Sequence, residues 1–449
     1  MKQLFTLCAG LIFTLSVFAQ SQNIQMLYNW TDTTLVGSST FNNTYNEVWG
    51  FEVNSHEFAV IGSTYGTHIF DITDLNNVSE VARIPGADQG PSIIHRDYHD
   101  YQGYLYAVAD EGASTLQIID ISNLPTSYSV VYDSDALFKR AHNIFIDTAT
   151  GKMYGNGVAV NNQTHKGFQC YDLSNPVAPV HVSDYSNAGL THDTYARNDT
   201  VFINAGNNGL YVLDYSDPLN PAVLGTLFDY PFKGYNHSGW LNDDGTLYFM
   251  ADENKGHEMK ALDVSDLSNI SVISTFYSDE DPNSMAHNQI WLDGYLFTAH
   301  YHDGLQIFDV SDPANPVRTG YYKTYQPSDY TSYRGAWGVY PYLSSGKILV
   351  SDMQYGLFVF DASQALSANE EIQSVQARVY PNPSQGDLQF DFAAHNERAP
   401  LEIFSMDGRM VYQDEIRSGE RLSLNLSPGL YIGKIQTQNG SAQVKFMIQ

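Results

Sequence analysis

Gly304-Leu-Gln-Ile-Phe-Asp-Val-Ser-Asp-Pro313 is the clearest copy of a short stretch that recurs seven times along this chain of 449 residues. Each copy ends in an aspartate that is followed by an apolar residue and then, in every case, by Ser or Thr. The other copies begin at Thr67, Thr115, Gly167, Gly209, Glu258 and Gly356. Seven similar segments at regular spacing indicate a repeat architecture.

The aspartates of the seven copies measure the length of the repeat. They are Asp71, Asp120, Asp172, Asp214, Asp263, Asp309 and Asp361, separated by steps of 49, 52, 42, 49, 46 and 52 residues. This period matches the roughly 40 to 50 residues of a four-stranded propeller blade. In the sixth unit, strand-like runs cover 288–292, 295–299, 305–309 and 317–322, with turn residues between them. The sequence therefore predicts an all-β protein with a seven-bladed β-propeller, in which the aspartates form turns.

The seventh unit lacks a fourth strand, because a polar stretch follows Asp361. The segment Ile24–Trp30 resembles the fourth strands of other units, so we expect it to close the last blade and to leave no open sheet edge. The propeller is then predicted over residues 20–363, followed by a polar linker over 364–377. Seven short strand-like runs within 378–449 predict a small Ig-like β-sandwich.

Composition and charge limit the partners and the compartment. Lys2, an apolar stretch and small residues at Val17 and Ala19 predict a cleaved secretory signal peptide over residues 1–19. Cys170 is then the one cysteine of the mature chain, so no internal disulfide forms. No later stretch has the apolar length of a membrane-spanning helix. A formal net charge of −28 argues against nucleic acid and favours cationic ligands or metals.

Two resemblances follow from these motifs. Tyr380-Pro-Asn-Pro383, Ile403–Gly408, Leu426–Tyr431 and Lys445–Gln449 resemble the C-terminal sorting domain of proteins exported by the bacterial type IX secretion system. This implies handling by that machinery, and passage through the periplasm to the cell surface or medium. Leu116–Asp120, Leu210–Asp214 and Leu305–Asp309 resemble LVIVD repeats, and residues 24–363 resemble the choice-of-anchor B family, which implies a propeller but no particular activity.

Candidate site residues lie just before the first strand of each unit. Five units have a histidine there, and we expect Trp49 and Trp337 to take this position in the other two. The histidines are His95, His142, His192, His237 and His287. Fifteen residues after the marked position, the turn after the second strand carries Asp110, Asn207, Asp252, His302 and Asp352. In a propeller these two turns lie on the same face, with the first strands around the central channel. Imidazoles and carboxylates together predict a site for zinc, manganese, iron or a similar divalent ion, and Glu111, Glu253 and Asp303 add to the negative charge there.

The same pattern permits other interpretations. A residue that recurs once per blade can be a structural device, in which each imidazole bonds to a neighbouring aspartate or backbone group. Trp49, Trp240, Tyr301 and Trp337 are candidates for stacking on a ligand. We predict an exported surface or extracellular binding protein with a metal or polar-ligand site on this face. The alternatives are a metal-dependent hydrolase or lyase that uses the same face, and a purely structural surface protein.

Overall fold

The computed structural model describes residues 20–160, 167–327, 332–367, 377–392, 398–405, 409–437 and 440–449. Contacts divide the chain into two compact units, Met1–Leu366 and Ser367–Gln449. The expected signal peptide lies outside the described residues. No helix within the described ranges is both long enough and apolar enough to cross a membrane.

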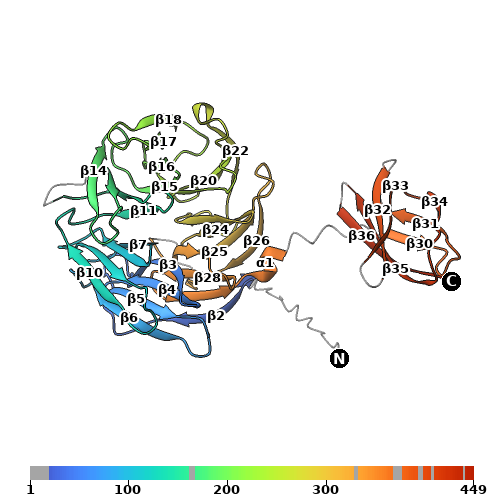
Figure 1. Ribbon diagram of the computed structural model, residues 1–449, viewed down its shortest axis with the longest axis horizontal. Helices are drawn as coiled ribbons and strands as arrows, with labels where there is room; N and C mark the ends of the chain where they lie inside the picture. The colour runs from blue at the N-terminus through green and yellow to red at the C-terminus, as the bar shows by residue number, and fades with distance from the viewer. Residues whose placement is uncertain are drawn as a thin grey trace, which may run out of the picture. The chain divides into compact units, whose positions relative to one another are not determined.

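The N-terminal unit is a β-propeller. Its described residues form seven antiparallel sheets arranged in a ring, with the fourth strand of each blade on the outer rim (Figure 1). The first three blades consist of β3 (Tyr45–Val53), β4 (His56–Ser63), β5 (Gly66–Asp71) and β6 (Ser79–Pro85); β7 (Arg96–Tyr101), β8 (Tyr104–Ala109), β9 (Leu116–Asp120) and β10 (Ser129–Ser134); and β11 (Asn143–Asp147), β12 (Lys152–Asn156), β13 (Phe168–Asp172) and β14 (Val180–Tyr185).

The remaining blades follow the same order. They consist of β15 (Asp193–Arg197), β16 (Thr200–Asn204), β17 (Leu210–Asp214) and β18 (Ala222–Leu227); β19 (Asn236–Leu241), β20 (Leu247–Asp252), β21 (Met259–Asp263) and β22 (Ser271–Phe276), with the 3-10 turn η1 (Leu267–Asn269); β23 (Gln289–Leu292), β24 (Tyr295–Ala299), β25 (Leu305–Asp309) and β26 (Val317–Tyr322); and β27 (Ala336–Tyr340), β28 (Lys347–Asp352) and β29 (Gly356–Asp361). The strands of the sixth blade agree with the sequence prediction to within one residue.

The last two blades receive strands from the N-terminal segment. β2 (Gln25–Trp30) pairs antiparallel with β29, with Gln25 opposite Asp361, and is the fourth strand of the seventh blade. β1 (Ser21–Gln22) adds a short fifth strand beside β26. The short helix α1 (Ser363–Ser367) follows β29, and the N–H of Ala365 donates to the carbonyl of Asn23. The N-terminal and C-terminal segments of the propeller therefore stabilise each other by direct pairing.

The repeated motif shapes the turn between the third and fourth strands. In each of the seven copies the aspartate carboxylate accepts a hydrogen bond from the backbone N–H two residues later, over 2.7–3.0 Å. This confirms the turn-forming role expected of the aspartates. At the start of the motif Gly304 has φ +75, and a Cβ there would lie 2.1 Å from the carbonyl oxygen of Tyr322. Only glycine fits this position.

The core of the propeller lies between blades. Phe58 and Ile69 of the first blade, for example, share a buried cluster with Leu105 and Ile119 of the second. Successive strand residues face opposite sides of a blade, so each blade presents apolar side chains to both neighbours. The first strands are thereby fixed around the central channel.

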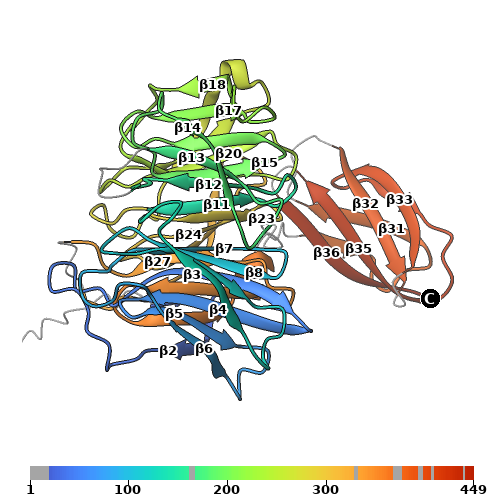
Figure 2. The ribbon, with the colours of Figure 1, turned by 60° about the vertical axis from the view of Figure 1, so that its left-hand side comes forward.

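The C-terminal unit is a two-sheet β-sandwich. One sheet has the order β30 (Ala377–Tyr380), β31 (Asp387–Phe392) and β34 (Arg421–Ser423), and the other has β33 (Met410–Arg417), β32 (Arg398–Ser405), β35 (Gly429–Thr437) and β36 (Gly440–Ile448). β32, β35 and β36 lie side by side in Figure 2. Phe390 of one sheet and Ile403 and Phe446 of the other belong to one buried cluster. The Ig-like connectivity of this unit stays a prediction.

Candidate functional site

The five predicted histidines line one cavity of about 220 Å³ in the central channel. They come from five consecutive blades and lie within two residues of the start of β7, β11, β15, β19 and β23. Tyr301, Trp337 and Glu253 line the same cavity. The blade repeat therefore brings together imidazoles that are up to 192 residues apart in the chain.

The imidazoles form a closed circuit of ring contacts. Ring centroids of neighbours lie 5.1 Å apart for His95 and His142, 4.2 Å for His142 and His192, 3.9 Å for His192 and His237, and 4.2 Å for His237 and His287. Trp337 closes the circuit, 4.5 Å from His287 and 4.9 Å from His95. The circuit narrows the channel and makes the wall of the cavity aromatic as well as polar.

Three of these histidines are oriented by oxygen acceptors behind them. Nδ1 of His95 lies 2.5 Å from Glu111, and Nδ1 of His142 lies 2.8 Å from Asp110. Nδ1 of His287 lies 2.6 Å from the carbonyl oxygen of Trp337. A carbonyl oxygen or a carboxylate accepts, so each Nδ1 carries a hydrogen and donates it, and in the neutral ring the lone pair is on Nε2. Metal-binding histidines are commonly oriented in this way.

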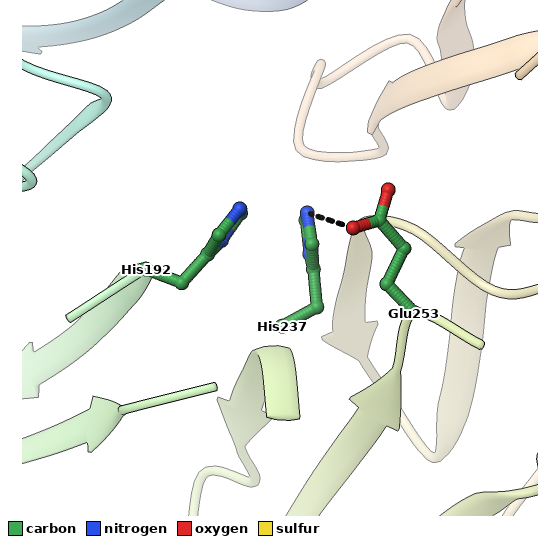
Figure 3. Close-up of side chains that lie close together, drawn as sticks. All are labelled: His192, His237 and Glu253. Atoms are coloured by element: carbon green, nitrogen blue, oxygen red, sulfur yellow. Dashed lines mark ion pairs between the residues drawn. The ribbon is translucent and has the colours of Figure 1, made fainter. Parts of the chain in front are cut away.

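His192 and His237 differ from the other three in the surroundings of their Nδ1 atoms. Figure 3 shows these two rings together with Glu253. Their Nδ1 atoms are buried, and neither has a hydrogen-bond partner among the described residues. Nε2 of His237 lies 3.9 Å from Oε2 of Glu253, and Tyr301 donates its hydroxyl hydrogen to Oε1 of Glu253 over 2.6 Å. One ligand atom from each of His192, His237 and Glu253 lies within 4.8 Å of the other two.

Burial keeps most of these imidazoles neutral. Burial, together with the other imidazoles, holds the pKa of His192 and of His237 well below the usual range. Burial also lowers the pKa of His287 to about 3, and it raises the pKa of Glu253 to about 7. His142 is the exception: burial opposes its charged form, but the hydrogen bond and charge of Asp110 raise its pKa. At neutral pH the pair His192 and His237 therefore offers lone pairs rather than charge.

Three of the predicted ligands lie elsewhere, which corrects the sequence assignment. Asp252 forms a fully buried ion pair of 2.7 Å with Lys260 and also accepts from the hydroxyl of Tyr230. Asp352 accepts from the backbone N–H groups of Gln354 and Tyr355 in the turn after β28. These carboxylates satisfy donors of their own blades and of the segment that connects one blade to the next. They do not line the cavity.

His302 is the third of these residues. It is 1% exposed, and its ring packs edge-on against Tyr325 at 5.7 Å. Its chain neighbour Tyr301, a predicted ligand-contacting residue, is the one that lines the histidine cavity. Asp110 does not line the cavity either, but it accepts the hydrogen bond from Nδ1 of His142 and so orients that ring.

The four predicted aromatic residues divide between the two ends of the channel. Trp337 and Tyr301 lie at the histidine cavity, whereas Trp49 and Trp240 line a second cavity. Trp337 is the second residue of β27, and His237 is likewise the second residue of β19. Trp49, by contrast, is the fifth residue of β3, which is the position that Trp240 has in β19. Trp49 therefore does not occupy the position of a histidine, which corrects that part of the prediction.

Sequence reasoning gave too little weight to four carboxylates. Glu253 enters the sequence prediction only as a flanking charge, and it is the acid that lies beside His192 and His237. Glu47, Asp97 and Asp193 line the channel beyond the histidines. The sequence does contain a pattern that places two of these carboxylates near the channel: Asp193 directly follows His192, and Asp97 comes two residues after His95.

Two family models match parts of the chain. Residues 378–449 match the Secretion system C-terminal sorting domain. Residues 101–132, 188–228 and 288–324 match the LVIVD repeat. The chain combines LVIVD repeats with a secretion sorting domain. The two matches confirm the resemblance to the sorting domain and to LVIVD repeats, whereas the choice-of-anchor B resemblance stays a prediction. The sorting domain points to handling by the type IX secretion system and to export to the cell surface or extracellular space.

Comparison with solved structures supports the fold. The β-propeller domain of Cps50 (Swd1) from Myceliophteria thermophila is 10% identical with a TM-score of 0.50, over 75% of this chain and 98% of that chain. PorZ, a surface component of the type-IX secretion system of Porphyromonas gingivalis, is 11% identical with a TM-score of 0.48, and the match covers 93% of this chain and 61% of PorZ. At such identities the likeness to Cps50 is one of fold alone. No curated protein matches the chain.

Proposed function

We propose that this protein is an exported binding protein whose propeller holds a divalent transition metal ion at His192, His237 and Glu253. The observation that carries the proposal is the cluster of two imidazoles and one carboxylate with ligand atoms within 4.8 Å of one another. Two nitrogen donors and one carboxylate oxygen suit zinc, iron, cobalt or nickel.

The unsatisfied Nδ1 of His237 supports this proposal. His237 is 3% exposed, and a buried polar atom without a partner costs stability unless something in the functional protein satisfies it. Its pKa is held low, so protonation is a poor way to satisfy the ring at neutral pH. A metal ion that accepts the lone pair of one ring nitrogen would hold this ring in a single tautomer and orientation, which no hydrogen bond to Nδ1 does in the described residues.

The size of the cavity supports a binding role for the metal. A volume of about 220 Å³ leaves room beside an ion, since one water molecule takes about 30 Å³ of liquid. Protein ligands at three positions leave coordination sites open for water or for a donor group of an extracellular ligand. The oriented rings of His95, His142 and His287 and the indole of Trp337 form the surrounding wall.

The proposed route to the surface uses both ends of the chain. The signal peptide would carry the chain into the periplasm, and residues 378–449 would direct it through the type IX machinery. The choice-of-anchor B resemblance of residues 24–363 fits a surface domain of this kind. Metal-dependent hydrolysis or elimination in the same cavity would need the same ion, so metal binding is the first property to measure.

Elemental analysis of the purified full-length protein tests the proposal. After incubation with zinc or cobalt and removal of free metal, one ion per chain is expected. Glu253→Gln, which keeps the shape of the side chain, should lose the ion or weaken its binding at least tenfold. His181→Ala is a matched control, because His181 is an exposed histidine that is paired with Asp184 on β14, far from the cavity lining. Wild-type protein that retains no metal would refute the proposal.

A further inference from the structure

The end of the channel where Trp49 and Trp240 lie has a second closed circuit of aromatic rings. Trp49 contacts His99 with ring centroids 4.6 Å apart, His99 contacts Phe145 at 5.1 Å, and Phe145 contacts Trp240 at 5.8 Å. Tyr342 and Tyr340 complete the circuit back to Trp49, with centroid distances of 6.1, 5.7 and 5.0 Å. Four of these rings, those of Trp49, His99, Phe145 and Trp240, line a cavity of about 50 Å³.

Carboxylates form the inner part of this cavity. Glu47, Asp97 and Asp193 line it, and Glu47 and Asp97 are 8% and 7% exposed. Each is fixed by backbone or amide donors: Glu47 accepts from Val48 N–H and from the Asn288 amide, Asp97 from Ile144 N–H, and Asp193 from Thr194 N–H. No lysine or arginine is among the described residues that line the cavity. The nearby Arg96 directs its guanidinium to the carbonyls of Ser63 and Asp88.

Gln289 is a second sign that the cavity receives a ligand. Its side chain is 2% exposed and belongs to the lining of the cavity. Neither its amide nitrogen nor its amide oxygen has a hydrogen-bond partner in the described part of the chain. A buried amide with both groups unsatisfied is unfavourable unless a bound molecule supplies a donor or an acceptor.

The spacing of the carboxylates favours a polyatomic cation over a metal ion. Triples of ligand atoms within 4.8 Å of one another occur at two places in the described residues, and Glu47, Asp97 and Asp193 are not one of them. A primary ammonium carries three N–H donors that diverge from one nitrogen, and its hydrogen bonds of about 2.8–3.0 Å are longer than the roughly 2.0–2.2 Å bonds of a transition metal, so it suits oxygen acceptors that are more widely spaced. Aromatic faces at the mouth attract a cation and also pack against an alkyl chain.

We propose that this end of the channel binds a primary ammonium group on an unbranched alkyl chain. The ammonium donates to Glu47, Asp97 and Asp193, and the alkyl chain passes between Trp49, Phe145 and Trp240. A lysine side chain of an extracellular protein and a free alkylamine share this chemistry. The site adjoins the histidine cavity, because Glu47, Asp97 and Asp193 also line the part of the channel that the five histidines line, and it does not depend on a metal.

Calorimetric titration of the full-length protein with n-butylammonium tests this proposal. Binding is expected for n-butylammonium, with at least tenfold weaker binding of the neutral n-butanol and of the bulkier tetramethylammonium. Trp240→Leu, and Glu47→Gln combined with Asp193→Asn, should each weaken binding tenfold or more. Asp243→Asn is the matched control. It removes an exposed carboxylate whose charge contributes to the raised pKa of Tyr195 and of Tyr342, so it lies near this end of the channel, but it does not line the cavity. It should change affinity by less than twofold.

Two further sets of measurements identify the source of the ammonium group and define the results that would overturn the proposal. A peptide with one accessible lysine binds if the partner is a protein, and free amines alone bind if it is a small molecule. Equal binding of butanol and butylammonium, competition by micromolar calcium, or full affinity in a folded Trp240→Leu variant would each overturn the proposal. Circular dichroism melting of every variant identifies the folded ones, and Trp240→Leu keeps the test decisive if the double variant does not fold.

Discussion

The imidazoles of His192 and His237 pack with ring centroids 3.9 Å apart, although they belong to different blades. Burial and then the neighbouring His192 ring lower the pKa of His237, because a second positive charge at this distance is unfavourable; burial and the rings of His142, His287 and His95 lower the pKa of His192. A charged acceptor fixes neither Nδ1. The close pair is thus the part of the histidine circuit that a purely structural role explains least well.

The turn glycines give a direct test of the blade geometry. Gly304→Ala should destabilise the propeller by about 3 kcal/mol or more, because the methyl group would meet the carbonyl oxygen of Tyr322 in a left-handed conformation. Gly346 has nearly the same φ, +77, with nothing within 4 Å of an added Cβ. Gly346→Ala should cost only about 1–2 kcal/mol. Urea denaturation of both variants measures the difference, and equal losses would contradict this account of the motif.

Closure of the ring predicts the effect of shortening the N-terminus. Deletion of residues 20–30 removes β1 and β2, leaves β29 with an open edge and should lower the melting temperature by roughly 5 °C or more while promoting aggregation. Deletion of residues 20–22 removes only β1 and is the control, with a clearly smaller expected loss. Equal melting temperatures for the two deletions would show that β2 does not stabilise the ring.

Glu47 predicts a pH dependence of stability. Burial raises its pKa from 4.5 to about 8 in the folded protein. Between these values the folded state binds more protons than the unfolded state, so this group's contribution to stability is complete below pH 4.5 and is lost as the pH rises through about 8. Glu47→Gln should therefore raise the free energy of unfolding at pH 9 relative to wild type and change it much less at pH 5. A stabilisation that is the same at both pH values would contradict the assigned pKa.

The sorting domain predicts the location of truncated protein. Without residues 378–449, the propeller should fold but remain inside the producing cell envelope instead of reaching the surface or medium. Melting of the purified truncated protein checks folding, and fractionation with surface labelling checks location. Normal surface display of the truncated chain would refute the assignment.

Most of the fold could be predicted from the repeat. The local pattern predicts four strands per period, the turn role of the aspartates and the need for a further strand in the seventh blade. It does so because every blade forms the same four-stranded antiparallel sheet. The location of five histidines in one cavity follows as well. In a closed ring, equivalent positions of the first strands must face the common axis.

The acidic ligands could not be predicted at the same level. The interval of fifteen residues measures position along the chain, but side chains one residue apart point to opposite sides of a strand. Asp252 ends β20 and pairs with Lys260 inside the blade, whereas the next residue, Glu253, faces the channel. Trp49 shows the same limit, since its place in β3 lies three residues beyond the position of a histidine in other blades. Which residue of a strand or turn faces the channel is therefore seen only in the structure.

X-ray absorption spectroscopy of the full-length protein loaded with zinc or cobalt tests the central claim most directly. We predict a first shell with two imidazole nitrogens at about 2.0–2.1 Å and a carboxylate oxygen, and loss of this shell in Glu253→Gln. A metal shell without imidazole scattering, or one with three or more imidazoles, would contradict the assignment to His192, His237 and Glu253.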